Sequence, residues 1–153
     1  MVGLMLRVWI SVILLGSALL VAPAAHAAKD PNLLKAEAFV DSRCPAGQRD
    51  ISTGMWMAGW RFNALYGNCS AGDGRDQHIW FFAGGRFIGA DTKEPFSSKE
   101  IFGVWRTGEL IAFMYVLYRP HDPNCCPTGG GKIVRFQLRE GHLVRLDALP
   151  ASR

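Results

Sequence analysis

The four cysteines of this 153-residue chain are its most reactive side chains: Cys44, Cys69, Cys125 and Cys126. An even number of cysteines in a small domain of an oxidising compartment predicts two disulfides. We rank the Cys125–Cys126 pairing last, because it closes a strained ring between neighbours. Cys44 and Cys69 are therefore predicted each to bond one cysteine of the 125–126 pair, as 44–125 with 69–126 or as 44–126 with 69–125. Either connectivity fastens the 120–131 loop to the N-terminal half.

A metal site is the alternative chemistry for the same loop. The thiolates of Cys125 and Cys126 and the imidazole of His121 suit copper or zinc. Adjacent cysteines on an extended chain point to opposite sides, which suits two disulfides better than one ion. We therefore predict no metal site and no cofactor.

The sequence contains no recognisable catalytic motif. Outside the first 27 residues, the histidines are His78, His121 and His142. None of them lies in a nucleophile-elbow, zinc-helix or phosphate-loop pattern, and Asp91 is expected in an ordinary turn at the surface. The chain is predicted not to be an enzyme, and a small metal-binding or hydrolytic enzyme is kept as an alternative.

The loop around the adjacent cysteines is the candidate contact surface. Its polar side chains are Arg119, His121, Asp122, Asn124 and Thr128. Three prolines in the same loop reduce the ordering entropy that is lost on binding. We predict that these side chains contact an envelope protein or a cell-wall component, and that nucleic acid is not a partner.

A short amphipathic helix is predicted over about residues 31–41. Asp30 is suited to cap its first amides, and Pro31 fits the first helical position. Apolar residues then recur at helical spacing, so the helix needs a sheet to cover.

The rest of the chain shows short apolar and aromatic runs separated by turn residues, which indicates antiparallel strands. Gly84-Gly85 is predicted to form a tight hairpin turn. That turn sets Phe82 opposite Phe87 and Phe81 opposite Ile88. The predicted fold class is α+β, mainly β: a twisted antiparallel sheet or small barrel with one N-terminal helix and two disulfides.

The C-terminal third contains an apolar run from Leu110 to Tyr118, interpreted as a strand, and a final hairpin. A two-residue turn at Glu140-Gly141 puts Phe136 opposite Arg145 and mixes the two faces. We therefore predict a longer loop around Gly141, and one such register also pairs Arg135 with Asp147. Trp80 and Trp105 are expected in the core, whereas Trp56 and Trp60 are not assigned.

The first 27 residues are typical of a secretory signal peptide. Met1 to Arg7 is a cationic start, Val8 to Ala22 is apolar, and Ala25-His26-Ala27 fits cleavage. A retained anchor is the alternative, but the apolar run is shorter than the ~20 residues of a bilayer span. The predicted organisation is a cleaved signal at 1–27 and a single disulfide-stabilised β-rich domain at 28–153.

The charge of the predicted domain does not indicate a nucleic-acid-binding protein. Arg7 is the only charged residue of 1–27, so one of the 17 Lys plus Arg is lost and all 13 Asp plus Glu are kept, a net charge of +3. This excess is small and scattered, without a basic stripe.

The stretch from Trp80 to Pro150 resembles the LppP/LprE family of actinobacterial lipoproteins. The matching features are Phe87-Ile88-Gly89-Ala90-Asp91-Thr92, Tyr115 to Tyr118, Asp122-Pro123, Pro127-Thr128-Gly129, Val134-Arg135-Phe136 and Leu146-Asp147-Ala148-Leu149-Pro150.

The resemblance implies an exported single-domain envelope protein without established catalysis, and it supplies no catalytic residues. The family name also implies acylation at a cysteine directly after the apolar segment. The first cysteine here is Cys44, so a soluble periplasmic or secreted form is implied instead.

The sequence thus predicts an exported, non-enzymatic envelope or periplasmic domain that contacts a protein or the cell wall. The alternative from a different class is a secreted inhibitor that inserts the 120–131 loop into the cleft of a lysozyme or protease.

Overall fold

The computed structural model describes residues 29–44, 50–69, 77–93, 100–123 and 125–151. The predicted signal peptide at 1–27 lies outside these residues. In this part of the chain the elements are α1 (Pro31–Asp41), β1 (Asp50–Ser52), β2 (Phe62–Asn68), β3 (Gln77–Ala83), β4 (Arg86–Ala90), β5 (Ile101–Thr107), β6 (Leu110–Val116), β7 (Gly131–Arg139) and β8 (His142–Arg145). None of the described residues forms a helix long and apolar enough to cross a membrane.

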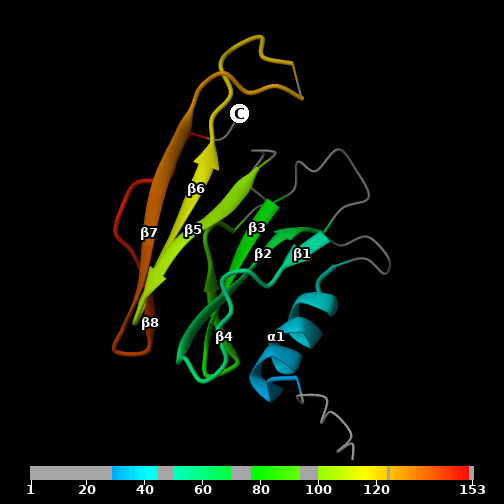
Figure 1. Cartoon of the computed structure of the whole chain (residues 1–153), viewed down its shortest axis with the longest axis vertical. Coiled ribbons are helices and arrows are strands. Elements are labelled where there is room, and N and C mark those ends of the chain that lie inside the picture. Colours follow the sequence, from blue (N-terminus) through cyan, green and yellow to red (C-terminus); the bar gives the residue numbers. More distant parts are fainter. Residues whose placement is uncertain (1–28, 45–49, 70–76, 94–99, 124, 152–153) are drawn as a thin grey trace, which may run out of the picture.

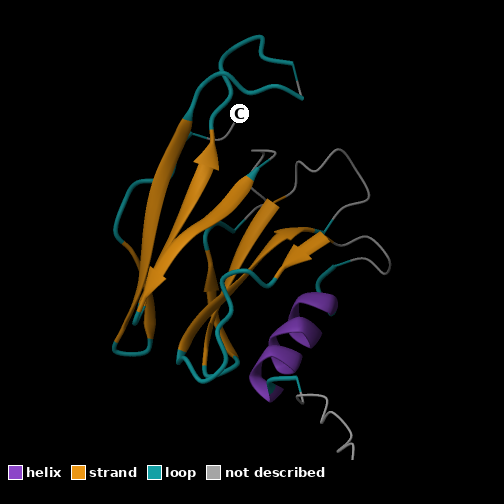
Figure 2. Ribbon diagram, in the orientation of Figure 1, coloured by secondary structure: helices purple, strands orange, loops and turns teal. Residues whose placement is uncertain are grey.

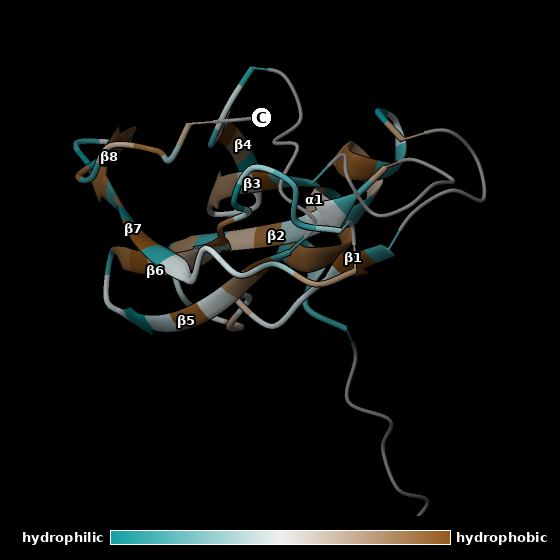
Figure 3. Cartoon of the chain, turned by 90° about the horizontal axis from the view of Figure 1, so that it is seen from above, coloured by the Kyte–Doolittle hydropathy of each residue, from teal (hydrophilic) through white to brown (hydrophobic). Residues whose placement is uncertain are grey.

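The strands form two four-stranded antiparallel sheets that face each other. The first sheet has the order β1-β2-β3-β4 and the second the order β5-β6-β7-β8. Alternate residues of β2, β3, β6 and β7 point into the space between the sheets, where Phe62, Phe81, Phe113 and Phe136 form the main core. Figure 3 shows hydrophobic residues recurring along these strands. The predicted mainly β, antiparallel fold with one helix is confirmed.

Helix α1 lies on the face of the first sheet that points away from the second sheet (Figure 2). Asp30 caps it by accepting a hydrogen bond from the backbone N of Asn32 at 3.0 Å, and Pro31 occupies its first turn. Ala36 and Val40 are fully buried against this face, in a second apolar cluster that includes Phe82. The predicted helix bounds are confirmed.

The β3–β4 hairpin turns at Gly84 and Gly85, both with positive φ. Phe82 pairs with Phe87 as predicted, but Phe81 pairs with Gly89 instead of Ile88, because a bulge shifts the register between Phe81 and Phe82. The bulge inserts one residue into the edge strand, which a pattern of apolar residues does not reveal.

The β7–β8 hairpin contradicts the predicted longer loop. Arg139 pairs with His142, so the turn is Glu140-Gly141, with φ of 50° and 82°, and Phe136 lies opposite Arg145. The mixed pair is tolerated because β8 is a short edge strand and Arg145, its last residue, is exposed.

The predicted pairing of the cysteines is wrong. Cys44 is bonded to Cys69, with 4.8 Å between their Cα atoms, and Cys125 is bonded to Cys126. Cys44 follows α1 and Cys69 follows β2, so the helix brings the first pair together on the first sheet. The other two cysteines lie in the β6–β7 loop at the end of the second sheet, so this loop is not fastened to the N-terminal half.

Candidate functional site

The loop between β6 and β7, residues 117–130, is organised around one carboxylate. Asp122 accepts hydrogen bonds from the backbone N of Arg119 at 2.6 Å and from the backbone N and hydroxyl of Thr128, both at 2.7 Å. At the base of the loop the backbone N of Leu117 donates to Gly130 O at 2.8 Å. These bonds give the loop a defined shape above the second sheet (Figure 1).

Four of the five predicted contact residues lie in the described part of this loop. One of them, Asp122, is engaged in the hydrogen bonds that hold the loop together. Arg119, His121 and Thr128 are exposed, and His121 has a positive φ of 74°. Asn124 lies outside the described residues. No group of three or more His, Cys, Asp or Glu in the described residues is arranged to hold a metal ion.

Next to this loop, the outer face of the second sheet exposes large apolar side chains. Phe102 of β5, Met114 of β6 and Ile133 of β7 form one row across the sheet, and Phe102 and Ile133 are 44% and 49% exposed. Val104 and Trp105 extend this apolar row along β5 and are also exposed. The expectation that Trp105 is a core residue is therefore wrong, whereas Trp80, which is 4% exposed, is in the core.

The structure also shows the surroundings of Trp56 and Trp60, the two tryptophans that were not assigned from the sequence. The indole N–H of Trp56 donates to Asp30 at 2.8 Å, which ties the segment before β2 to the helix cap. Trp60 is exposed, and the guanidinium of Arg106 lies 4.5 Å from its ring centroid.

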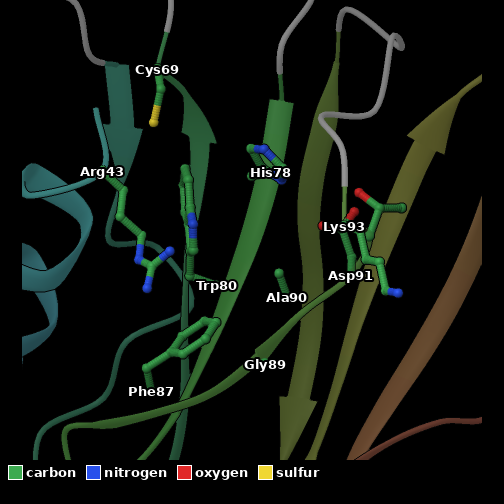
Figure 4. A pocket seen from close by; sticks show the side chains of 10 residues that line it. Arg43, Cys69, His78, Trp80, Phe87, Gly89, Ala90, Asp91 and Lys93 are labelled. Carbon is green, nitrogen blue, oxygen red and sulfur yellow. The ribbon is translucent and has the colours of Figure 1, made fainter. Parts of the chain in front are cut away.

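A cavity of 740 Å³ lies on the outer face of the first sheet, beyond the C-terminal end of α1. Figure 4 shows Trp80 and Phe87 on one side of it and Asp91 and Lys93 on the other. The lining residues are Arg43, Cys69, His78, Trp80, Phe87, Gly89, Ala90, Asp91, Thr92 and Lys93.

Asp91, at the edge of this cavity, is 5% exposed and not the surface residue that its sequence context predicts. Its carboxyl oxygens accept from the backbone N of Ile79 at 3.0 Å and from the hydroxyl of Tyr115 at 2.8 Å. Burial raises the pKa of this carboxyl, although the hydrogen bonds from Ile79 and Tyr115 oppose the shift. The same burial, together with the nearby carboxylate, raises the pKa of Tyr115.

A sequence model described as LppP/LprE lipoprotein matches residues 64–141, half of the chain. The chain belongs to the LppP/LprE lipoprotein family. No curated protein and no solved structure matches it significantly. Family membership associates the protein with the cell envelope.

The region that matches the LppP/LprE family runs from β2 to the β7–β8 turn. It contains the central strands of both sheets, the β6–β7 loop and the Asp91–Tyr115 hydrogen bond, and it excludes α1. Both Asp91 and Tyr115 lie in segments that carry the resemblance in the sequence. Their contact was missed, because nothing in a single sequence pairs a turn after one sheet with a strand of the other.

Proposed function

We propose that this chain is an exported, non-catalytic domain of the cell envelope that binds another protein. Its contact surface is the outer face of the second sheet, with the adjoining 117–130 loop at its edge. The observation that carries this proposal is the apolar row across the outer face, in which Phe102 and Ile133 are exposed and Met114 between them is half-buried.

Exposed apolar side chains that are contiguous and bordered by polar groups are characteristic of protein-binding surfaces. Here the border is supplied by Arg119 of the loop and by Arg135 and Arg139 of β7. Arg135 is neutralised by Asp147, to which its Nη2 donates at 2.8 Å. The shape of the loop is set by its internal hydrogen bonds, so little ordering entropy is lost when it touches a partner.

The charge at this border favours a partner that is a different protein with an acidic rim. Within the described residues no ion pair joins Arg119 or Arg139 to an acid. In a symmetric dimer the same face of two copies meets, so these cations are brought towards each other.

Export is supported by three independent features. The family is one of envelope proteins, the N-terminal sequence is typical of a secretory signal, and two disulfides suit an oxidising compartment. The proposed location is periplasmic or secreted.

The test is photocrosslinking in cells that produce the full chain, with a benzophenone amino acid placed at Ile133. We expect an adduct with one other envelope protein, identified by mass spectrometry. Leu34 on α1 is the matched control position, since its side chain is 49% exposed, as is that of Ile133. No adduct with the same protein is expected there.

The partner identified in this way is then purified and its affinity for the domain is measured. Phe102→Glu is expected to weaken binding at least tenfold, whereas Leu34→Glu leaves it unchanged, and added salt weakens binding further. Adducts between two copies of the chain, equal adducts at both positions, or an affinity insensitive to Phe102→Glu contradict the proposal.

A further inference from the structure

We propose that the cavity on the first sheet is a second binding site, which takes a small anion with a planar apolar ring. It lies on the face opposite the proposed protein-contact surface and does not depend on it. The inference comes from the origin of the cavity, its aromatic lining and the charges at its edges.

The cavity exists because α1 is shorter than the strand it covers. The helix begins beside the β3–β4 turn, where an added Cβ at Gly85 lies 2.9 Å from Asn32. Its 11 residues extend about 16 Å, whereas the 7 residues of β3 extend about 23 Å. The part of β3 that carries His78 therefore lies beyond the helix end, whereas Trp80 still packs in the cluster that contains Ala36 and Val40 of the helix. The Cys44–Cys69 disulfide limits the cavity on that side.

The aromatic surface of the cavity comes mainly from the half-buried rings of His78 and Phe87, because Trp80 is 4% exposed and contributes little. The rings of His78 and Trp80 lie 5.3 Å apart, and Ala90, the partner of Trp80 on β4, leaves space beside the indole. Phe87 closes the lower side in Figure 4. The volume of 740 Å³ falls within the range of small-molecule sites, and a ring that stacks on aromatic side chains suits this lining.

The charges at the edges favour an anion. Arg43 is held in place by aromatic rings, with its guanidinium 4.5 Å from the centroid of Phe39 and 5.8 Å from that of Phe87. Lys93 lies on the opposite side of the cavity (Figure 4). Among the described residues no ion pair joins either cation to an acid.

Asp91, the acid that lines the same cavity, forms no ion pair with these cations among the described residues. Both of its carboxyl oxygens are engaged within the fold, by Ile79 and Tyr115. An anionic group on a ligand therefore finds two cationic side chains that form no ion pair among the described residues. An anion without a ring lacks the stacking surface, and a ring without a charge lacks the two cations.

The test uses four probes that separate ring from charge: indole-3-acetate, tryptamine, 3-methylindole and acetate. Binding to the folded domain is followed by the NMR shifts of the Trp80 and Ala90 amides. Indole-3-acetate is expected to bind at least tenfold more tightly than each of the other three probes.

Arg43→Met and Lys93→Met each remove one charge and keep the length of the side chain, and each is expected to weaken indole-3-acetate binding about tenfold. Arg139→Met, on the second sheet, is the matched control and leaves binding unchanged. Ala90→Leu fills the cavity and is expected to abolish binding with both cations present. Thermal unfolding shows which variants are folded.

The inference is overturned if indole-3-acetate gives no saturable shifts at millimolar concentration. It is also overturned if tryptamine binds equally well, or if the Arg43→Met/Lys93→Met double variant binds indole-3-acetate as the unmodified domain does. Phe102→Glu, which tests the protein-contact surface, is expected to leave probe binding unchanged. The two proposals can therefore fail separately.

Discussion

At the scale of single residues, Asp91 and Tyr115 join the two sheets. Asp91 follows β4 at the edge of the first sheet, and Tyr115 lies in β6 of the second sheet. Both are buried, so neither polar group can exchange its partner for water without local opening. The hydrogen bond between them therefore fixes the position of one sheet relative to the other at this end of the core.

Tyr115→Phe is expected to lower the free energy of unfolding by about 1–3 kcal/mol, because it leaves a buried carboxyl oxygen without its donor. Urea denaturation followed by tryptophan fluorescence measures the loss. Tyr66→Phe, a half-buried tyrosine packed against the same core, is the control and is expected to change stability less. Equal losses in the two variants contradict a specific role for the Tyr115 hydroxyl.

Asp147 differs from Asp91: burial raises the pKa of Asp91, whereas hydrogen bonds lower the pKa of Asp147. Hydrogen bonds from the side chain and the backbone N of Arg135 lower the pKa of Asp147 from 3.8 to about 2. Because the pKa in the folded state is lower, this group stabilises the fold above about pH 4 and the contribution disappears as the pH falls towards 2.

NMR titration of the Asp147 carboxyl is therefore expected to give a midpoint near pH 2. Arg135→Gln is expected to move the midpoint towards 3.8 but not fully, since the backbone N of residue 135 still donates to the carboxylate. Arg139→Gln serves as control and leaves it unchanged. A midpoint near 3.8 in the unmodified protein rules out the ion pair in solution.

At the scale of elements, the Cys44–Cys69 disulfide connects the end of α1 to the end of β2. It closes a loop with a sequence separation of 25, whereas Cys125 and Cys126 are adjacent. The chain entropy removed from the unfolded state grows with loop length, so the two disulfides differ strongly in their effect on stability.

The Cys44→Ala/Cys69→Ala variant is expected to lose about 3 kcal/mol of stability, and Cys125→Ala/Cys126→Ala less than about 1 kcal/mol. Chemical denaturation of the two variants, monitored by circular dichroism, gives the comparison. A larger loss from the second variant shows that the 117–130 loop contributes to the fold more than its contacts indicate.

Elements whose signals are local could be predicted from the sequence. The helix bounds follow from Asp30, Pro31 and the apolar spacing, and the β3–β4 turn follows from two adjacent glycines. The β7–β8 turn could not be predicted from the rule that residues paired across two strands share the core face or the solvent face. Arg145 pairs with the buried Phe136 but still reaches solvent at the end of a short edge strand.

Sites that combine segments far apart in the chain could not be predicted from the sequence. Cysteine pairing depends on where α1 lies on the sheet, and the cavity depends on the helix ending before the strand does. Arg43, His78 and Lys93 come from three separate segments and meet only through this arrangement. No periodicity or motif in the chain connects them.

At the scale of the whole molecule, the two sheets present separate outer surfaces. The first carries α1 and the cavity, and the second carries the exposed apolar row and the 117–130 loop. Arg106 of β5 links the sheets at the end remote from Asp91. Its guanidinium donates to Met55 O at 2.9 Å, to Asn63 Oδ1 at 2.8 Å and to Phe62 O; Asn63 and Phe62 lie in β2, and Met55 lies in the connection between β1 and β2.

Arg106 carries its charge among half-buried groups, and burial lowers its pKa. Three of its acceptors lose their donor if the side chain is removed, and Asn63 is itself buried. Arg106→Met is therefore expected to cost about 2–4 kcal/mol of stability in urea denaturation, although the new side chain is apolar and of similar length.

Arg61→Met provides the matched control, because Arg61 also links the two sheets, through an exposed ion pair with Glu109 at 3.7 Å. Exposed ion pairs contribute little, so a loss below about 1 kcal/mol is expected. Similar losses in both variants mean that the hydrogen bonds of Arg106 to the first sheet are not the main link. A large loss confined to Arg106→Met shows that one desolvated side chain keeps the two sheets together at this end of the core.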